Sequence, residues 1–200
     1  MKSFILTRQW RDTAKGIEID LWLSSDDGPI KLTIPQQKAI FFIRQIDIEK
    51  VAQCLHIAVP SSTKKPPRSV VSLPITIQAV PLKNFHGEAV AGVYCSQYRQ
   101  LRELCAELDR QHINYWENDI RPPERFLMER FVTGSLVLPD GVVSKHQNHT
   151  YSVAHTDKVK ATDYHPSLSV VSLDIETSMD ARELYSICLL YTSPSPRDRG

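Results

Sequence analysis

Hydrophobic and polar residues alternate along the beginning of the chain with the period of two that is typical of β-strands. Apolar and aromatic side chains run through Phe4–Trp10 and predict a first strand. In residues 17–23 every odd position is apolar, which predicts a second strand with one buried face and with Asp20 on its polar face. The turn residues Asp26–Pro29 separate it from a third alternating stretch, 30–34. The pattern therefore predicts a β-meander.

Two later stretches repeat their apolar residues with the period of an α-helix. Residues 48–55 carry one apolar stripe behind Asp47, which we expect to cap the helix. Residues 101–108 place theirs at i, i+3, i+4 and i+7, and apolar extended stretches flank them at 90–95 and 113–116. A β-α-β unit together with a meander predicts an α+β fold, in which a mixed sheet carries helices on one side.

Paired prolines mark the segment 119–131. The residues before Pro122 should be extended, and a proline opens a helix well because its missing N–H group is not needed there. Glu124 in the first turn suits the positive end of the helix dipole. We expect Leu127 and Phe131 to share one face of this helix.

Three arginines of this segment, Arg121, Arg125 and Arg130, are candidates for contacts with nucleic-acid phosphates. Glutamates lie near them in the sequence, so each arginine is equally able to form an ion pair at a seam between domains. We favour this structural interpretation slightly over phosphate binding.

The composition is that of an ordinary folded protein, with 200 residues, 42% of them hydrophobic and 24% charged, and a net charge of +1. This balance excludes a strongly basic nucleic-acid-binding tail, although a local basic patch is compatible with it. The four cysteines and the histidines show no standard zinc spacing, which favours free thiols over a zinc site. Apolar runs stay far below the roughly 20 residues that cross a bilayer, so we expect no membrane partner.

The candidate chemistry lies at Asp174 and Glu176, which follow the β-branched run 169–173. Residues i and i+2 of a strand point to the same face, so the two carboxylates project together and Ile175 points away from them. Paired hard oxygen ligands suit Mg²⁺ or Mn²⁺, and carboxylates this close repel each other unless a cation lies between them. Without further context this pair of acids is a weak motif, because many strands end in two acidic residues simply because strand ends are exposed to water.

A connection and a return strand follow the acidic pair, at residues 177–182 and 184–189. RNase-H-like nucleases begin with an acidic pair on the first strand of a hairpin. In two-metal phosphoryl chemistry such acids hold ions that activate water against a phosphodiester. We therefore expect the N-terminal mixed-sheet domain to be followed by the first hairpin of an RNase-H-like exonuclease domain.

Four regions of the chain resemble family-B DNA polymerases, most closely those of the bacterial polymerase II type. They are Phe4–Asp12, Leu82–His86 with Val93–Cys95, Asp119–Phe131, and Val171–Thr177. The third region is similar nearly residue for residue, and the fourth resembles the first exonuclease motif of the family. With weaker stretches, the resemblance extends from about Phe4 to Leu189.

The resemblance implies a DNA-directed DNA polymerase with a 3′-5′ proofreading exonuclease that acts in DNA replication and repair. Its N-terminal domain would help to shape the DNA channel and would contact single-stranded template. Asp174 and Glu176 would be catalytic, metal-binding carboxylates of a two-metal Mg²⁺ or Mn²⁺ site, and Glu176 would help to position the attacking water. The implied partners are template and primer DNA, dNTPs and a sliding clamp, in the bacterial cytoplasm at the nucleoid.

This resemblance divides the chain into an N-terminal domain (1–150), a connecting segment (151–166), an incomplete start of the exonuclease domain (167–189) and a non-native tail without apolar periodicity (190–200). The chain would then be the inactive front of a larger DNA-handling enzyme. Two alternatives remain open. One is a free-standing nucleic-acid-binding module with a vestigial acidic hairpin, and the other is a separate RNase-H-like 3′-5′ exonuclease with an unusual N-terminal domain.

Overall fold

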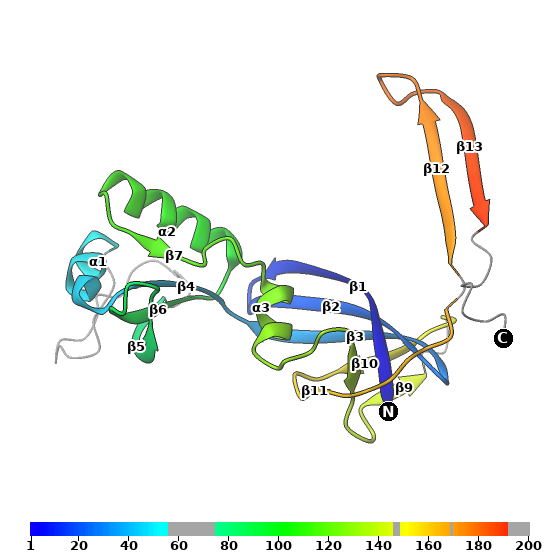
Figure 1. The fold of residues 1–200 in the computed structure, drawn as a ribbon, viewed down its shortest axis with the longest axis horizontal. Helices are drawn as coiled ribbons and strands as arrows, with labels where there is room; N and C mark the ends of the chain where they lie inside the picture. Colours follow the sequence, from blue (N-terminus) through cyan, green and yellow to red (C-terminus); the bar gives the residue numbers. More distant parts are fainter. Residues whose placement is uncertain (56–74, 146–148, 169, 192–200) are drawn as a thin grey trace. The chain divides into compact units, whose positions relative to one another are not determined.

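The computed structural model describes residues 1–55, 75–145, 149–168 and 170–191 (Figure 1). The chain forms two units, Met1–Tyr164 and His165–Gly200, and each is described by itself. Residues 192–200, which make up most of the expected non-native tail, lie outside the described residues.

The first unit begins with the predicted meander. Strands β1 (Lys2–Thr13), β2 (Gly16–Ser25) and β3 (Gly28–Gln37) pair antiparallel in sequence order, which confirms the prediction from the alternating pattern. Four short strands extend this sheet: β8 (Ser135–Val137), β9 (Val143–Lys145), β10 (Ser152–His155) and β11 (Lys160–Ala161).

The resulting seven-stranded sheet has the order β11-β8-β1-β2-β3-β10-β9. It is mixed, as predicted, because β10 runs parallel to β3 while the other neighbours are antiparallel. The segment 151–166, for which the sequence predicts only a connection, thus supplies two strands of the sheet, β10 and β11. The strand order places β9 and β11 at the two edges of the sheet.

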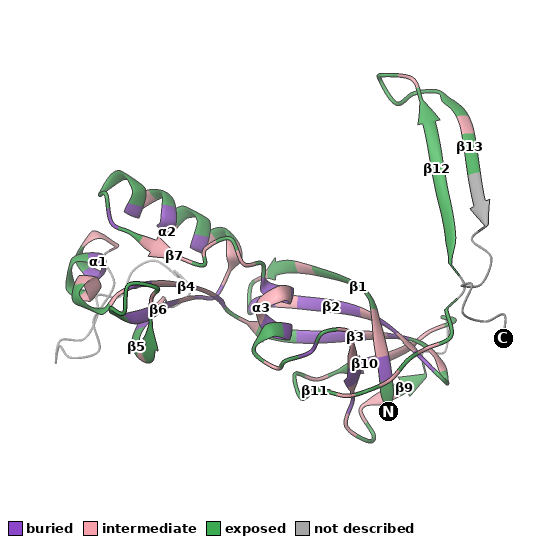
Figure 2. Ribbon diagram, in the orientation of Figure 1, coloured by how far each residue is buried: buried purple, intermediate pink, exposed green. Residues whose placement is uncertain are grey.

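The central strand of the mixed sheet, β2, is buried along most of its length, and its neighbour β3 is buried mainly between Ile30 and Ile34 (Figure 2). Their apolar residues 17, 19, 21, 23, 30, 32 and 34 are at most 1% exposed and form one side of the core. The prediction that only one face of β2 is buried is wrong at Asp20, which is 3% exposed. Arg11 on β1 and Lys31 and Thr33 on β3 surround this carboxylate with polar partners.

The remaining strands of the first unit form a second, four-stranded sheet. Its strands are β4 (Ala39–Arg44), β5 (Thr76–Lys83), β6 (Ala89–Cys95) and β7 (Tyr115–Trp116), and their order is β5-β6-β4-β7 with every pair antiparallel. The predicted β-α-β unit (β6, α2, β7) is present, but it lies in this separate antiparallel sheet and not in the mixed one.

Two helices accompany the four-stranded sheet. A short 3-10 helix (Gln45–Asp47) leads into α1 (Ile48–Cys54), and α2 spans Tyr98–Arg110. The chain order is therefore β-α-β-β-α-β with β4 and β6 in the centre, which is the split β-α-β arrangement. Side chains from both helices join the core residues of β4 and β6, so α1 and α2 cover one face of this sheet (Figure 1).

The expected cap of α1 is not formed. Asp47 precedes the helix, but its side chain makes no capping hydrogen bond. Instead, the Arg44 side chain donates to the Asp47 carboxylate at 2.8 Å, so that the acid is engaged with the preceding strand. All four cysteines are free, as expected, and Cys188 is exposed.

Helix α3 (Pro122–Met128) begins at the paired prolines, as predicted. Leu127 is buried, but the prediction that Phe131 shares its face is wrong, since Phe131 is 86% exposed. The helix ends at Met128, and Phe131 has a left-handed backbone with a φ of 53°. The neighbouring Phe126 takes the buried position instead.

The second unit contains the predicted hairpin, with β12 (Val171–Thr177) antiparallel to β13 (Leu184–Tyr191). Every residue of β12 is exposed, in contrast to the buried strands β2 and β3 of the first unit (Figure 2). Within the described part of the chain, no helix is long and apolar enough to cross a membrane.

Candidate metal and nucleic-acid sites

Asp174 and Glu176 lie two residues apart on β12, so that their side chains project from the same face of the hairpin. The strand register places Cys188 opposite Asp174 and Ser186 opposite Glu176. Ile175, between the two acids, pairs with Ile187 on the other face. The structure therefore gives the hairpin one acidic face and one apolar face.

Both carboxylates are exposed. The backbone N–H group of Ile175 donates to Asp174 Oδ1 at 2.9 Å, and among the described residues neither acid forms an ion pair. Carboxylate oxygens are the donors that Mg²⁺ and Mn²⁺ prefer, so the donor chemistry fits such an ion. In the described part of the chain, however, no group of three or more His, Cys, Asp and Glu side chains could hold a metal.

A third carboxylate of the hairpin, Asp180, is engaged locally in the connection between the strands. The Ser178 hydroxyl donates to Asp180 Oδ1 at 2.6 Å, and Arg182 Nε lies 3.5 Å from its other oxygen. The hydrogen bond from Ser178 and one from the backbone of Arg182 lower the pKa of Asp180. This carboxylate shapes the turn and does not join the pair on β12.

The structure separates the three candidate arginines. Arg125 is only 13% exposed: its Nη2 donates to Glu117 at 2.6 Å, and its guanidinium lies 5.5 Å from the centre of the Phe42 ring. Arg130 lies 3.7 Å from the ring centre of Phe126 and donates to the carbonyl oxygen of that residue. These contacts support the structural interpretation for Arg125 and Arg130.

Arg121 differs from the other two because its side chain is exposed. Its guanidinium lies 5.9 Å from the centre of the Trp10 ring, and Trp10 in turn contacts Tyr98 edge-on. Among the described residues no ion pair is formed by Arg121, whereas the nearby Arg8 is paired with Glu124 at 3.1 Å. Of the three candidates, Arg121 therefore offers the most available charge for a phosphate.

The sequence of this chain is similar to sequences of known DNA polymerases. Residues 3–38 match the family model described as DNA polymerase II, N-terminal, and residues 71–113 match the model described as DNA polymerase II, insertion domain. DNA polymerase II of Escherichia coli K12 is 36% identical over 186 residues, which is 93% of this chain. The chain spans 21% of the length of that relative.

The fold is similar to that of a solved structure, the family B DNA polymerase from the hyperthermophilic archaeon Pyrobaculum calidifontis. The TM-score is 0.62 at 13% sequence identity, and the similarity covers 97% of this chain and 27% of that one. The fold of the chain is thus similar to the fold of a family B DNA polymerase, and its sequence is similar to that of DNA polymerase II. The two family models that match are those of the N-terminal and insertion domains of DNA polymerase II.

Proposed function

We propose that the chain is the N-terminal part of a DNA-directed DNA polymerase with 3′-5′ exonuclease activity, which acts in DNA replication and repair. The observation that carries this proposal is the 36% identity with DNA polymerase II, because it includes both units of the chain. A free-standing binding module or a separate exonuclease is not favoured, since neither explains matches to two successive DNA polymerase II domains.

In this proposal Asp174 and Glu176 are catalytic, metal-binding carboxylates of the exonuclease. Their shared face on β12 and their exposure support this role, and further ligands would come from residues beyond this hairpin. Mg²⁺ or Mn²⁺ held there in a two-metal site would stabilise charge on a phosphodiester and activate water. The protein's own contribution is to project the two carboxylates from the same face of β12, where Glu176 would orient the attacking water.

The first unit is proposed to contact template and primer DNA, and dNTPs and a sliding clamp are proposed partners of the longer protein. Arg121 is the candidate phosphate contact that its exposure supports best. The protein would act at the nucleoid in the bacterial cytoplasm, as expected for a relative of a bacterial DNA polymerase.

The test uses a longer protein that carries this region together with the polymerase domain. Asp174→Ala and Glu176→Ala should each lower degradation of a single-stranded 3′ end by at least about 100-fold, because each removes a metal ligand, while dNTP incorporation is retained. Gel assays of a labelled primer measure both activities in the same reaction.

Asp180→Ala is the matched control, because it removes a carboxylate of the same hairpin that is occupied with Ser178 and Arg182. It should leave both activities near those of the unmodified protein. Degradation that survives both the Asp174 and the Glu176 substitutions would contradict the site assignment, and a longer protein without any dNTP incorporation would contradict the proposed function.

A further inference from the structure

The four-stranded sheet has one face that α1 and α2 do not cover. Along β4 the buried residues Phe41 and Ile43 alternate with the half-buried residues Ile40 and Phe42. The buried residues share a core with α1 and α2, so Ile40 and Phe42 point to the opposite face. We call this opposite side the open face of the sheet.

Aromatic rings gather on the open face. Trp116 on β7 is the register partner of Phe42, and Tyr94 on β6 is the register partner of Ile40, so all lie on the same side. Both aromatic residues are half-buried. The Tyr94 ring lies across Gly92, since a Cβ atom at Gly92 would be 2.9 Å from the ring. Gly92 is itself opposite Phe42, so the Tyr94 ring extends over the sheet toward the phenylalanine.

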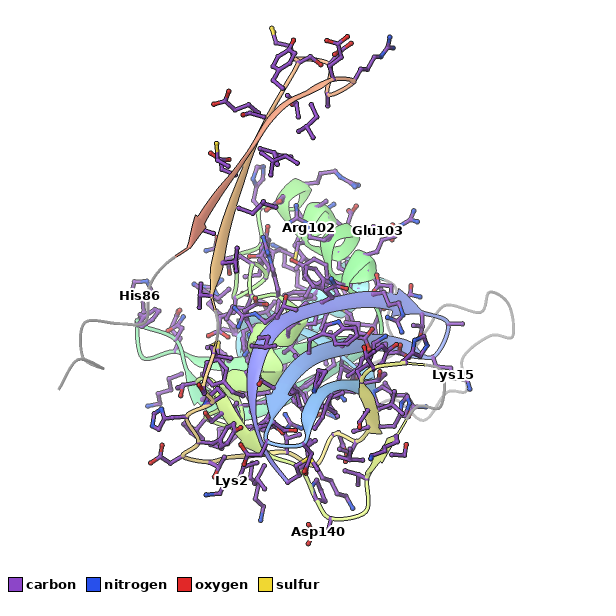
Figure 3. All side chains as sticks on the ribbon, turned by 90° about the vertical axis from the view of Figure 1, so that its right-hand side faces the viewer. Lys2, Lys15, His86, Arg102, Glu103 and Asp140 are labelled. Carbon is purple, nitrogen blue, oxygen red and sulfur yellow. The ribbon has the colours of Figure 1, made fainter. Side chains whose placement is uncertain are left out.

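A pocket of about 290 Å³ lies beside these rings. Phe42 and Trp116 line it together with Phe85, which is 104% exposed in the turn between β5 and β6. The Asn84 side chain accepts hydrogen bonds from the backbone N–H groups of His86 and Glu88, both at 3.0 Å, and this fixes the turn. Figure 3 shows the turn, marked by His86, projecting away from the helix that carries Arg102 and Glu103.

The charges around the open face are few and nearly balanced. Glu117 is neutralised by Arg125 at 2.6 Å. Lys38 lies 6.0 Å from the ring centre of Tyr94, Lys83 lines the pocket, and neither lysine has an ion pair within the described part of the chain. Asp119 also lines the pocket. Two available lysines suffice for one or two phosphates, but they are too few for the many backbone contacts that duplex binding requires.

We propose that the open face binds unpaired nucleotides of DNA, with bases stacked on Phe42, Tyr94 and Trp116 and with Lys38 and Lys83 near the phosphates. A four-stranded sheet that has helices behind it and aromatic rings in front is a known way to stack two or three unpaired bases. Base–aromatic stacking tolerates any sequence, because every base has a flat π-face. Topology alone does not imply function, so the aromatic rings and the pocket carry this inference.

The proposal rests on the proposed function for the choice of DNA as the nucleic acid, and it goes further by assigning a surface. That surface consists of residues from the insertion-domain match and its neighbouring strands, away from the carboxylates of β12 in the sequence. This surface does not use the candidate arginines for phosphate binding. Arg125 lies against the Phe42 ring and is paired with Glu117, so its charge is not available to a phosphate.

The test measures binding of fluorescein-labelled dT12 to the full chain by anisotropy. Tyr94→Leu and Trp116→Leu keep apolar volume but remove the stacking ring, and each should weaken binding by about tenfold or more. Trp22→Leu is the matched control, since Trp22 is a half-buried aromatic residue on the other sheet. Circular dichroism checks that each variant keeps the fold.

The dependence of binding on salt and on the type of strand provides two further tests. With one or two phosphate contacts, the slope of log K against log salt should be about −0.7 to −1.4. A duplex of the same length should bind at least about tenfold more weakly than dT12, since paired bases cannot stack on the sheet. A preference for rU12 of about tenfold or more would overturn the assignment to DNA in favour of RNA.

Crosslinking gives a readout that does not depend on variants. An oligonucleotide with 5-iododeoxyuridine should crosslink to the peptides that contain Tyr94 or Trp116, as identified by mass spectrometry. The proposal is overturned if dT12 does not bind, if crosslinks fall only elsewhere, or if Trp22→Leu weakens binding as much as Trp116→Leu. Such a result leaves the proposed function standing, because the Asp174 and Glu176 variants test it separately in the longer protein.

Discussion

Asp20 shows how the mixed sheet holds a charged side chain in its interior. The Thr33 hydroxyl donates to Asp20 at 2.7 Å, Arg11 donates at 2.6 Å, and Lys31 Nζ lies at 3.2 Å. Burial by itself would raise the pKa of Asp20, but the hydrogen bonds from Thr33, Arg11 and Lys31 outweigh it and lower the pKa. The ionised carboxylate therefore stabilises the folded state.

We expect Asp20→Asn to lower the free energy of unfolding at pH 7 by about 2 kcal/mol, because it removes charge-assisted hydrogen bonds at a buried site. A depressed folded-state pKa means that this stabilisation is present above the ordinary value of 3.8 and is lost as the pH falls through the lower folded-state pKa. The difference between the two proteins should thus shrink at pH 3. Urea unfolding followed by tryptophan fluorescence measures it.

Asp27→Asn is the control for this prediction, since Asp27 is an exposed acid in the turn between β2 and β3. It should change the free energy of unfolding by less than about 0.5 kcal/mol at either pH. If the two substitutions had equal effects, Asp20 would contribute no more to the stability of the folded state than a surface acid does.

At the element scale, helix α2 is capped by a residue from a distant strand. Gln97 occupies the N-cap position without a capping side-chain bond. Instead, the backbone N–H groups of Tyr98 and Arg99 donate to the two carboxylate oxygens of Asp12 on β1, at 2.8 and 2.9 Å. The negative charge also lies at the positive end of the helix dipole. One carboxylate thus joins the mixed sheet to the helix of the other sheet.

Asp12→Ala should lower the free energy of unfolding by about 1–2 kcal/mol, as expected for the loss of an N-terminal cap. Asp12→Asn keeps one acceptor oxygen, so its free energy of unfolding should fall by less than that of the alanine variant. Thermal unfolding followed at 222 nm measures both variants. If alanine and asparagine were both indistinguishable from the unmodified chain, the Asp12 carboxylate would not cap α2 in solution.

At the scale of the whole molecule, the two units bury their apolar residues to different extents. Leu21 on β2 is 0% exposed, whereas Leu173 on β12 is 61% exposed. The stability of the first unit rests on a packed core, while an isolated two-stranded hairpin is marginal in water. The second unit therefore contributes little to the stability that unfolding of the first unit reports.

Leu21→Ala and Leu173→Ala form a matched pair that tests this contrast. Leu21→Ala should cost about 2–5 kcal/mol, because it leaves a cavity in the core. Leu173→Ala should change the free energy of unfolding of the first unit by less than about 0.5 kcal/mol, as is usual for an exposed position. Urea unfolding of each variant gives both values, and similar costs would contradict the assignment of the core to the first unit alone.

Much of the fold was predictable from local patterns. The strands of the meander, helix α2, the proline start of α3 and the β12–β13 hairpin all follow from apolar periodicity and turn residues. Strand β4 was not predictable in this way, because Ala39–Arg44 has consecutive apolar residues without alternation. The open face of the second sheet escaped prediction for the same reason, since it depends on which of those residues point away from the helices.

The acidic pair and the resemblance to family-B DNA polymerases can both be recognised in the amino-acid sequence without a structure. The i, i+2 spacing of Asp174 and Glu176 sets their common face on any strand, and the proline-arginine segment carries the resemblance to polymerases. The burial of Asp20, the pairing of Arg125, the exposure of Arg121 and the capping of α2 by Asp12 become visible only in the folded chain. These outcomes depend on contacts between residues far apart in the chain, which no local pattern records.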